Sequence, residues 1–341
     1  MKIDHFDLDE QVMIVAEIGN NHEGDFTLAQ DLIGLAAEAG AHAVKFQTFR
    51  TEDYISRRET DRFARLKSFE LSPAQFERLR EIATDLGVLF LSTPFDIVSA
   101  HQLGPLVAAM KIASGDTTFF PLLEAIAETA KPILLSTGMA TLDEIRAAKN
   151  TIERVWKERS ITQEMAILHC VSSYPVPPEQ ANLAAIGDLS NEFGCTIGYS
   201  DHTMGNEAAA ISVALGARIV EKHFTIDKHH SDFRDHHLSA DPTELRELVD
   251  RIQRISTLMG DGEKIPQPSE VGATKSLRRS IAARCDLSEG TIIEAKDLTW
   301  VRPATGLAPG NEHLVLGRRL LEPISAGDPI LLQLLANEAA G

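Results

Sequence analysis

Residues 198–225, GYSDHTMGNEAAAISVALGARIVEKHFT, contain two short apolar segments that each end in a histidine. The first ends at His202 and the second at His223, and a helical run of small residues, 206–216, lies between them. Read as strand–helix–strand, this order predicts that both histidines lie at the same ends of adjacent parallel strands. A lone histidine at a strand end is more often a polar rim residue. Two neutral imidazoles that converge on one point, however, predict a divalent-metal site.

The same alternation of strands and helices runs through the first three quarters of the chain. Helix boundaries are marked by Pro73 at a first-turn position and by the capping-box pair Thr141 and Glu144. Eight strand–helix units in series predict an α/β fold, a (β/α)8 TIM barrel. A doubly wound sheet is disfavoured because the segment after the first strand, NNHEG, is not a glycine-rich nucleotide fingerprint. The near-continuous apolar runs predicted as strands are residues 12–17, 42–47, 88–92, 109–113, 132–136, 165–169, 196–200 and 218–223.

The composition changes after Gly260. Residues 263–278 are polar and contain two prolines and a glycine, so we predict a linker there, which ends a barrel domain at 1–262. Short β-like runs broken by turn residues follow, and they predict a small β-rich domain at 279–341. A domain of this size lies near the lower limit for independent stability and gains by packing on a barrel.

The bulk composition limits the possible partners. The 341 residues carry a net charge of −17, which argues against nucleic acid and anionic membranes as partners. No apolar run approaches the ~20 residues that span a bilayer, and the acidic start MKIDHFDLDE lacks a signal pattern. The three cysteines are widely spaced and predict neither a disulfide framework nor a zinc knuckle. We therefore expect a cytoplasmic protein.

Lysines lie within two of the predicted strands. Lys45 and Lys111 are flanked by apolar residues, which is costly inside a barrel unless each lysine meets an anion. A lysine at a strand edge, with its head in water, is the alternative. The turns Ser114-Gly115 and Ser136-Thr137-Gly138 follow neighbouring strands and offer hydroxyl and amide donors. Because active sites of such barrels lie at the carboxyl ends of the strands, the sequence predicts a phosphate or carboxylate site there.

The strand-end motifs resemble a known family. AEIGNNHEGD, VKFQTF, STPFD, KIASGD, LLSTGMAT, HCVSSYP, GYSDHT and EKHFT, in this order, are similar to motifs of the sialic acid (nonulosonic acid) synthases. KSLRRSIAA, DLTWVRPATGL and LGRRL resemble the C-terminal antifreeze-like (SAF) domain of these enzymes. The resemblance covers nearly the whole chain. It implies condensation of phosphoenolpyruvate with an N-acetylated hexosamine, such as N-acetylmannosamine, to give a nonulosonic acid and phosphate.

The resemblance also implies roles for single residues. His202 and His223 would bind Mn²⁺ or Mg²⁺, and Glu17 and Asp116 are the candidates for water delivery and proton removal. Arg302 would enter the barrel of a neighbouring subunit, which implies a domain-swapped homodimer. Phosphoenolpyruvate would be held by Lys45, Thr93, Lys111, Ser114, Ser136 and Ser200. The sugar would meet Gln47, Tyr174 and Asp235, and Arg302 would bind substrate from the neighbouring subunit.

Several positions depart from the family pattern and leave the sugar open. Asp116 replaces a glutamate, Ser172 stands where some members have asparagine, and Phe233-Arg234 replaces Gly-Pro. The histidine-rich segment 229–237 is predicted to be a solvated loop rather than a set of extra metal ligands. Three alternatives therefore remain: another phosphoenolpyruvate–aldose condensing enzyme, an aldolase that uses free pyruvate, and a non-catalytic sugar-binding relative.

Overall fold

Eight parallel strands close into one barrel in the first of two units, Met1–Gly260. The computed structural model describes residues 1–339 of the chain. It confirms the predicted (β/α)8 barrel, with every strand within two residues of its predicted bounds on either side. Around the barrel the strands are β3 (Met13–Gly19), β4 (Ala43–Thr48), β5 (Leu89–Pro94), β6 (Met110–Ile112), β7 (Ile133–Ser136), β8 (Met165–Cys170), β9 (Thr196–Asp201) and β10 (Ile219–His223), and β10 pairs with β3.

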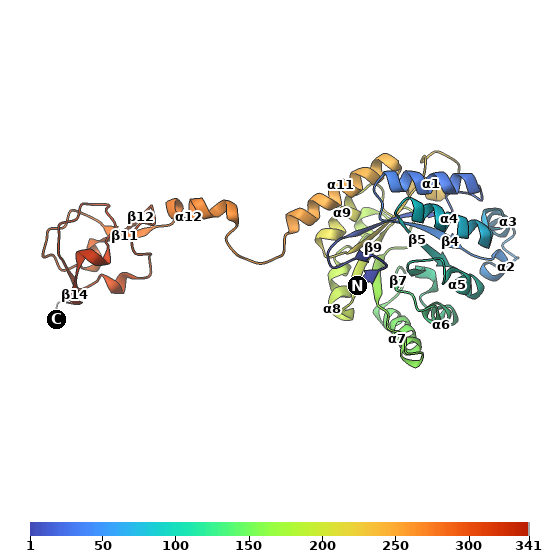
Figure 1. Ribbon diagram of the computed structural model, residues 1–341, viewed down its shortest axis with the longest axis horizontal. Coiled ribbons are helices and arrows are strands. Elements are labelled where there is room, and N and C mark those ends of the chain that lie inside the picture. The colour runs from blue at the N-terminus through green and yellow to red at the C-terminus, as the bar shows by residue number, and fades with distance from the viewer. Residues whose placement is uncertain (340–341) are drawn as a thin grey trace. The chain divides into compact units, whose positions relative to one another are not determined.

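Helices surround the barrel strands in Figure 1. Their ends follow local chemistry: the Thr141 hydroxyl accepts a hydrogen bond from the Glu144 amide, and the Glu144 carboxylate accepts one from the Thr141 amide, as the capping box predicts. The helices are α1 (Phe26–Glu38), α2 (Thr51–Tyr54), α3 (Thr60–Phe69), α4 (Pro73–Asp85), α5 (Ile97–Leu103), α6 (Phe120–Glu128), α7 (Leu142–Glu158), α8 (Ala185–Phe193), α9 (Glu207–Ala214), α10 (Arg234–Leu238) and α11 (Pro242–Met259). Within residues 1–339, no helix combines the length and the apolarity needed to cross a bilayer.

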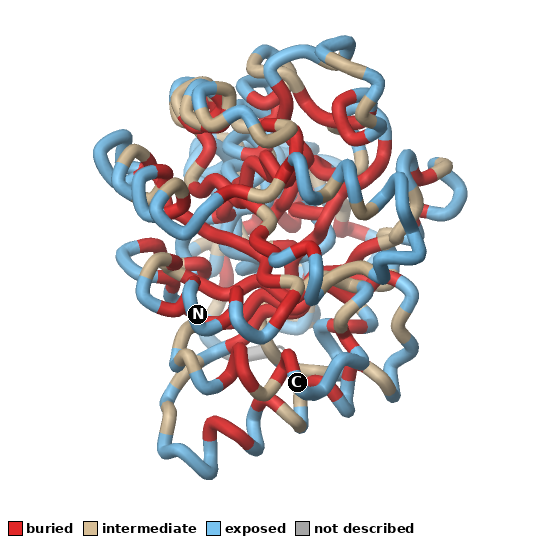
Figure 2. The backbone as a smooth tube through the Cα atoms, turned by 90° about the vertical axis from the view of Figure 1, so that its right-hand side faces the viewer, coloured by how far each residue is buried: buried red, intermediate tan, exposed pale blue. Residues whose placement is uncertain are grey.

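Side chains of the strands alternate between two hydrophobic clusters, and the buried positions run along the strands (Figure 2). Residues such as Val44 and Val220 face the helices and belong to the outer cluster. Their neighbours Ala43 and Ile219 belong to a smaller cluster inside the barrel. Because the side-chain period of a strand is two, the inner face of each strand continues toward the cavity with the residue two positions further on.

The two ends of the barrel interior are filled differently. An N-terminal hairpin of β1 (Lys2–Ile3) and β2 (Phe6–Asp7) adds Ile3, Phe6 and Leu8 to the inner cluster, beside Met13 at the start of β3. The hairpin therefore closes the amino-terminal end with apolar side chains. Toward the carboxyl ends, the inward positions become charged or hydroxylated, beginning with Lys45.

The second unit, Asp261–Gly341, has its own small core of residues such as Ile281, Leu298 and Val315. Its strands are β11 (Ser280–Ala283), β12 (Leu298–Val301), β13 (Arg318–Leu320) and β14 (Leu335–Ala339), which form two antiparallel pairs. The segment predicted as a polar linker contains a helix, α12 (Val271–Leu277). The domain boundaries at 262 and 278 stay a prediction.

Candidate active site

A cavity of about 750 Å³ opens at the carboxyl ends of the barrel strands. Lys111 does not line it, but its ammonium group donates a hydrogen bond to Ser136, which does. Arg302 belongs to the second unit, so its predicted role at the cavity stays a prediction. The other predicted residues all line the cavity: Glu17, Lys45, Gln47, Thr93, Ser114, Asp116, Ser136, Tyr174, Ser200, His202, His223 and Asp235.

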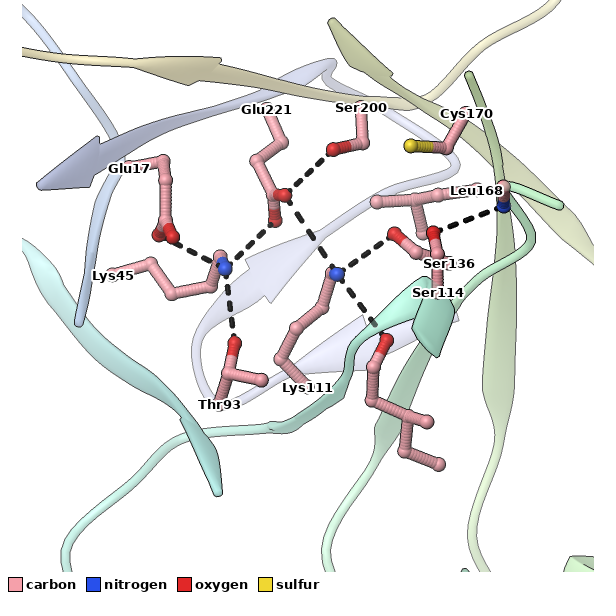
Figure 3. Close-up of polar contacts among 12 residues, drawn as sticks. Glu17, Lys45, Thr93, Lys111, Ser114, Ser136, Leu168, Cys170, Ser200 and Glu221 are labelled. Carbon is pink, nitrogen blue, oxygen red and sulfur yellow. Dashed lines mark hydrogen bonds and ion pairs between the residues drawn. The ribbon is translucent and has the colours of Figure 1, made fainter. Parts of the chain in front are cut away.

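Lys45 lies among Glu17, Glu221 and Thr93 on the cavity floor (Figure 3). Its side chain is only 3% exposed, and its Nζ lies 2.9 Å from Glu17 Oε2 and 3.5 Å from Glu221 Oε2. It also donates a 3.0 Å hydrogen bond to the Thr93 hydroxyl. Burial alone would lower the pKa of Lys45, but Glu17 and Glu221 outweigh it and raise the pKa, so the ammonium form is held.

Lys111 forms the second cationic centre of the floor (Figure 3). Its Nζ donates to the Ser136 hydroxyl at 2.7 Å and to the Ile112 carbonyl at 3.3 Å, and it lies 3.7 Å from Glu221 Oε1. Burial lowers the pKa of Lys111, and Glu221 opposes that shift. The expectation that each buried lysine meets an anion is confirmed, and within the chain itself the anions are carboxylates.

Glu221 was missed as a site residue by the sequence reasoning. Burial raises its pKa, but Lys111 and Lys45 outweigh burial and bring the pKa to about 2. Its position between the two lysines requires three strands that are far apart in sequence. The only signal was its place two residues before His223, on the inward face of the same strand.

The hydroxyls of the floor differ in what they offer a ligand. Thr93 and Ser136 accept hydrogen bonds from the two lysines, and Ser114 accepts one from the Gly138 amide. A hydroxyl that accepts in this way still has its own hydrogen to donate. Ser200 instead donates its hydrogen to Glu221 Oε1 at 2.8 Å. Thr93, Ser136 and Ser114 therefore suit an anion better than Ser200 does.

The two histidines lie at matched strand ends, as the sequence predicts. Their ring centroids are 5.3 Å apart, and both side chains line the cavity. His202 Nδ1 lies 2.9 Å from the Val171 carbonyl, so Nδ1 carries a hydrogen. Burial lowers the pKa of His202, but the Cys170 side chain and the Val171 carbonyl outweigh burial and raise the pKa, and Nε2 has a lone pair for a metal only in the neutral ring. Burial lowers the pKa of His223 far below its usual value, which keeps that imidazole neutral.

This donor set fits a divalent cation in part. Neutral imidazoles are metal ligands, and a backbone carbonyl that orients one of them is common at metal sites. Among the described residues, no group of three or more His, Cys, Asp or Glu side chains is arranged to hold a metal ion. A cation at His202 and His223 would therefore take its remaining ligands from water or substrate.

Tyr174 and Asp235, two of the residues predicted to meet the sugar, line the cavity together with Asp116. Burial raises the pKa of Asp116 to about 6, although Lys111 acts in the opposite direction. The Arg234 guanidinium lies over the Tyr174 ring, 5.0 Å from its centroid, and 3.2 Å from Asp235 Oδ1. Tyr174 also packs against His202. The residue pair that departs from the family pattern, Phe233-Arg234, therefore lines the same cavity.

The prediction of a solvated loop at 229–237 is wrong for its last residues, because the helix α10 begins at Arg234. His236 is fully buried in α10, with Nδ1 2.6 Å from the Thr225 hydroxyl and Nε2 3.0 Å from Glu23 Oε1. His229 and His230 are exposed, as predicted. The sequence missed the burial because Glu23 follows the first strand and meets His236 only when the barrel closes.

Fold and cavity together define a (β/α)8 barrel protein with a charged floor at the carboxyl ends of its strands. Residues 32–264 match the NeuB family and residues 278–336 match the SAF domain. The chain belongs to the NeuB family, and the resemblance to sialic acid synthases is confirmed.

Relatives with known names cover nearly the whole chain. It is 39% identical over 332 residues to N,N'-diacetyllegionaminic acid synthase from Legionella pneumophila, with 93% of both chains covered. It is 31% identical over 339 residues to N-acetylneuraminate-9-phosphate synthase from Homo sapiens, which covers 95% of this chain and 92% of the human one. The crystal structure of N-acetylneuraminic acid (sialic acid) synthetase from Leptospira borgpetersenii, in complex with citrate, is 38% identical and superposes with a TM-score of 0.73, over 77% of this chain and 90% of that one.

Proposed function

We propose that this protein is a nonulosonic acid synthase that condenses phosphoenolpyruvate with an N-acetylated hexosamine, N-acetylmannosamine or a related sugar, and releases phosphate. Membership in the NeuB family and the named synthases among its relatives support nonulosonic acid synthesis. One observation supports phosphoenolpyruvate as the donor: the floor combines two buried lysines with hydroxyls that still have hydrogens to donate.

That floor suits a phosphate group for a chemical reason. Phosphate oxygens only accept hydrogen bonds, and they are best bound by positive charge together with directed donors. Lys45 and Lys111 supply the charge, while Thr93, Ser136 and Ser114 supply O–H groups. Glu17 and Glu221 hold the lysines in place before the substrate arrives, so little reorganisation is required.

The proposed reaction forms one carbon–carbon bond and breaks one carbon–oxygen bond. The methylene carbon of phosphoenolpyruvate attacks the aldehyde carbon of the open-chain sugar, water adds to the former enol carbon, and the tetrahedral intermediate expels phosphate. Asp116, with a pKa of about 6, is mostly ionised at neutral pH and suits removal of the proton from water. A divalent cation at His202 and His223 would supply polarisation of the aldehyde oxygen. Tyr174 and Asp235 line the cavity where they can orient the sugar.

The direct test measures phosphate release from phosphoenolpyruvate in the presence of N-acetylmannosamine and of a panel of other hexosamines and aldoses. We expect release that depends on an N-acetylated hexosamine, stops with a chelator and returns with Mn²⁺. Release with aldoses alone would identify a different condensing enzyme, and sugar binding without any release would identify a non-catalytic relative. Full turnover in the His202→Ala/His223→Ala variant would remove the metal from the proposal.

We also propose that the site is completed by Arg302 from a second subunit of a domain-swapped homodimer. The test mixes two inactive variants, Lys111→Met and Arg302→Ala, after dissociation and reassembly. If Arg302 acts in its partner's barrel, random mixing restores about a quarter of wild-type activity, because half of the dimers are mixed and each has one intact site. If Arg302 acts within its own chain, mixing restores nothing.

A further inference from the structure

A buried ion pair lies on the outer side of the barrel, next in sequence to both histidines. Asp201 and Lys222 are register partners across β9 and β10, and Lys222 Nζ lies 2.8 Å from Asp201 Oδ2. The two side chains are 0% and 1% exposed. Because strand side chains alternate, Ser200 and Glu221 face the cavity floor while this pair faces the helices. Neither member of the pair lines the cavity.

The pair is bonded to the turn that carries His202. Lys222 Nζ donates a second hydrogen bond, 2.6 Å long, to the Thr203 carbonyl. Asp201 Oδ1 accepts a 2.8 Å hydrogen bond from the Thr203 amide. The Thr203 amide is therefore held by Asp201, and the Thr203 carbonyl is held by Lys222, the residue directly before His223. The turn of one histidine is fixed to the strand of the other.

Stability alone is a weak explanation for this pair. Removing two charges from water is costly, and a well-packed apolar pair at such a position often stabilises a fold as well or better. A third polar group is also recruited, since the Tyr199 hydroxyl lies 3.1 Å from Asp201 Oδ1. What an apolar pair cannot do is hold the Thr203 amide and carbonyl in one orientation. The ion pair therefore fixes geometry rather than adding stability, and the geometry that it fixes is that of the two histidines.

We propose that Asp201 and Lys222 are positioning residues that fix the separation and direction of the His202 and His223 imidazoles for a divalent cation. The proposal rests on the metal part of the proposed function. Under this proposal, a pair on the outer face of the barrel sets the spacing between two metal ligands that line the cavity. Groups that orient metal ligands commonly change metal affinity 10- to 100-fold when they are removed.

The experiment compares Mn²⁺ affinity of the full-length protein with that of the Asp201→Val/Lys222→Met variant, from the electron paramagnetic resonance signal of free Mn²⁺. We expect a folded variant that binds Mn²⁺ about 10- to 100-fold more weakly, while its affinity for phosphoenolpyruvate without metal is unchanged because the floor lysines are untouched. Ser99→Ala is the matched control. It removes a buried hydrogen bond away from the cavity, from the Ser99 hydroxyl to Asp96 Oδ2, and should leave Mn²⁺ affinity unchanged.

Each outcome bears on a different part of the proposal. Wild-type affinity for Mn²⁺ in the folded double variant overturns the positioning role and leaves the metal site standing. Absence of Mn²⁺ binding by the wild-type protein, or equal binding by His202→Ala, overturns the metal site and the positioning role with it. If the double variant does not fold, the same measurement on Asp201→Asn decides, because asparagine keeps the shape and removes the charge. Weaker Mn²⁺ binding with unchanged affinity for phosphoenolpyruvate then supports the role.

Discussion

Two serines of the cavity floor differ in where their hydrogens go. Ser136 accepts from Lys111 and keeps its hydrogen for a ligand, whereas Ser200 donates to Glu221. We predict that Ser136→Ala raises the KM for phosphoenolpyruvate roughly 10- to 100-fold, since it removes a hydrogen bond to a charged group. Ser200→Ala should raise the same KM much less. Steady-state kinetics with phosphoenolpyruvate as the varied substrate checks both, and equal effects would contradict the assignment.

Asp116 is expected to destabilise the fold in its ionised form. One of its oxygens, Oδ2, is buried without a hydrogen-bond partner among the described residues, and burial raises the pKa of Asp116 to about 6. A folded-state pKa above the unfolded value means that ionisation costs stability, fully above about pH 6 and not below about pH 4. Asp116→Asn should therefore raise the free energy of unfolding by about 1–3 kcal/mol at about pH 7.5, and the gain should vanish as the pH falls toward 4.

Urea unfolding of wild-type and Asp116→Asn protein at several pH values measures the gain in the free energy of unfolding. A gain that does not change with pH would show that ionisation of Asp116 is not its cause. Activity should move in the opposite direction. If the Asp116 carboxylate takes the proton from water, wild-type kcat/KM rises with pH through about 6. The variant should lose both this rise and most of its turnover.

Within the β9–α9–β10 element, one glycine sets how closely two strands approach. A Cβ at Gly198 would lie 2.8 Å from the Ile219 carbonyl oxygen and 2.9 Å from Leu168 Cγ. We predict that Gly198→Ala lowers the free energy of unfolding by about 1–3 kcal/mol, because strands and core must shift. Gly34→Ala in α1 is the control: no atom lies within 4 Å of its added Cβ, and alanine should stabilise the helix by up to about 1 kcal/mol. Chemical denaturation of both variants checks the pair, and equal losses would argue against crowding.

Charge is distributed unevenly over the whole molecule. The chain carries a net charge of −17, yet Arg62 and Arg65 of α3 are exposed at the mouth of the cavity. A local cationic mouth raises the encounter rate of an anionic substrate despite an opposite net charge. We predict that Arg62→Gln/Arg65→Gln lowers kcat/KM for phosphoenolpyruvate about 3- to 10-fold at low ionic strength, and that the loss shrinks as salt screens the charges.

The matched control for this prediction changes the net charge equally at a distance from the cavity. Arg146 and Arg154 on α7 pair with acidic residues on the surface, and neither lines the cavity. Arg146→Gln/Arg154→Gln should leave kcat/KM and its salt dependence unchanged. Kinetics over a series of salt concentrations compares the two variants. A loss shared by both would show that net charge, rather than the cavity mouth, is responsible.

Local pattern was enough to predict the barrel and the rim of its site. Parallel strands that are buried on both faces appear in the sequence as short apolar runs. The residues that follow each run lie at the rim of the barrel, whatever the order of the strands in the closed sheet. His202 and His223 were paired on this ground, and their matched strand ends are confirmed. The motifs then added the family, which the matches to the NeuB and SAF models confirm.

The sequence by itself determined the strand–helix order, the family and the residues at each strand end, because these depend on periodicity over a few residues. Only the tertiary structure decided which charges meet. Glu221 lies between Lys45 and Lys111 only because β10, β4 and β6 are brought around one closed sheet. Which face of β10 carries Lys222 and which carries His223 likewise follows from where that strand is paired, since a shift of one residue exchanges the two faces.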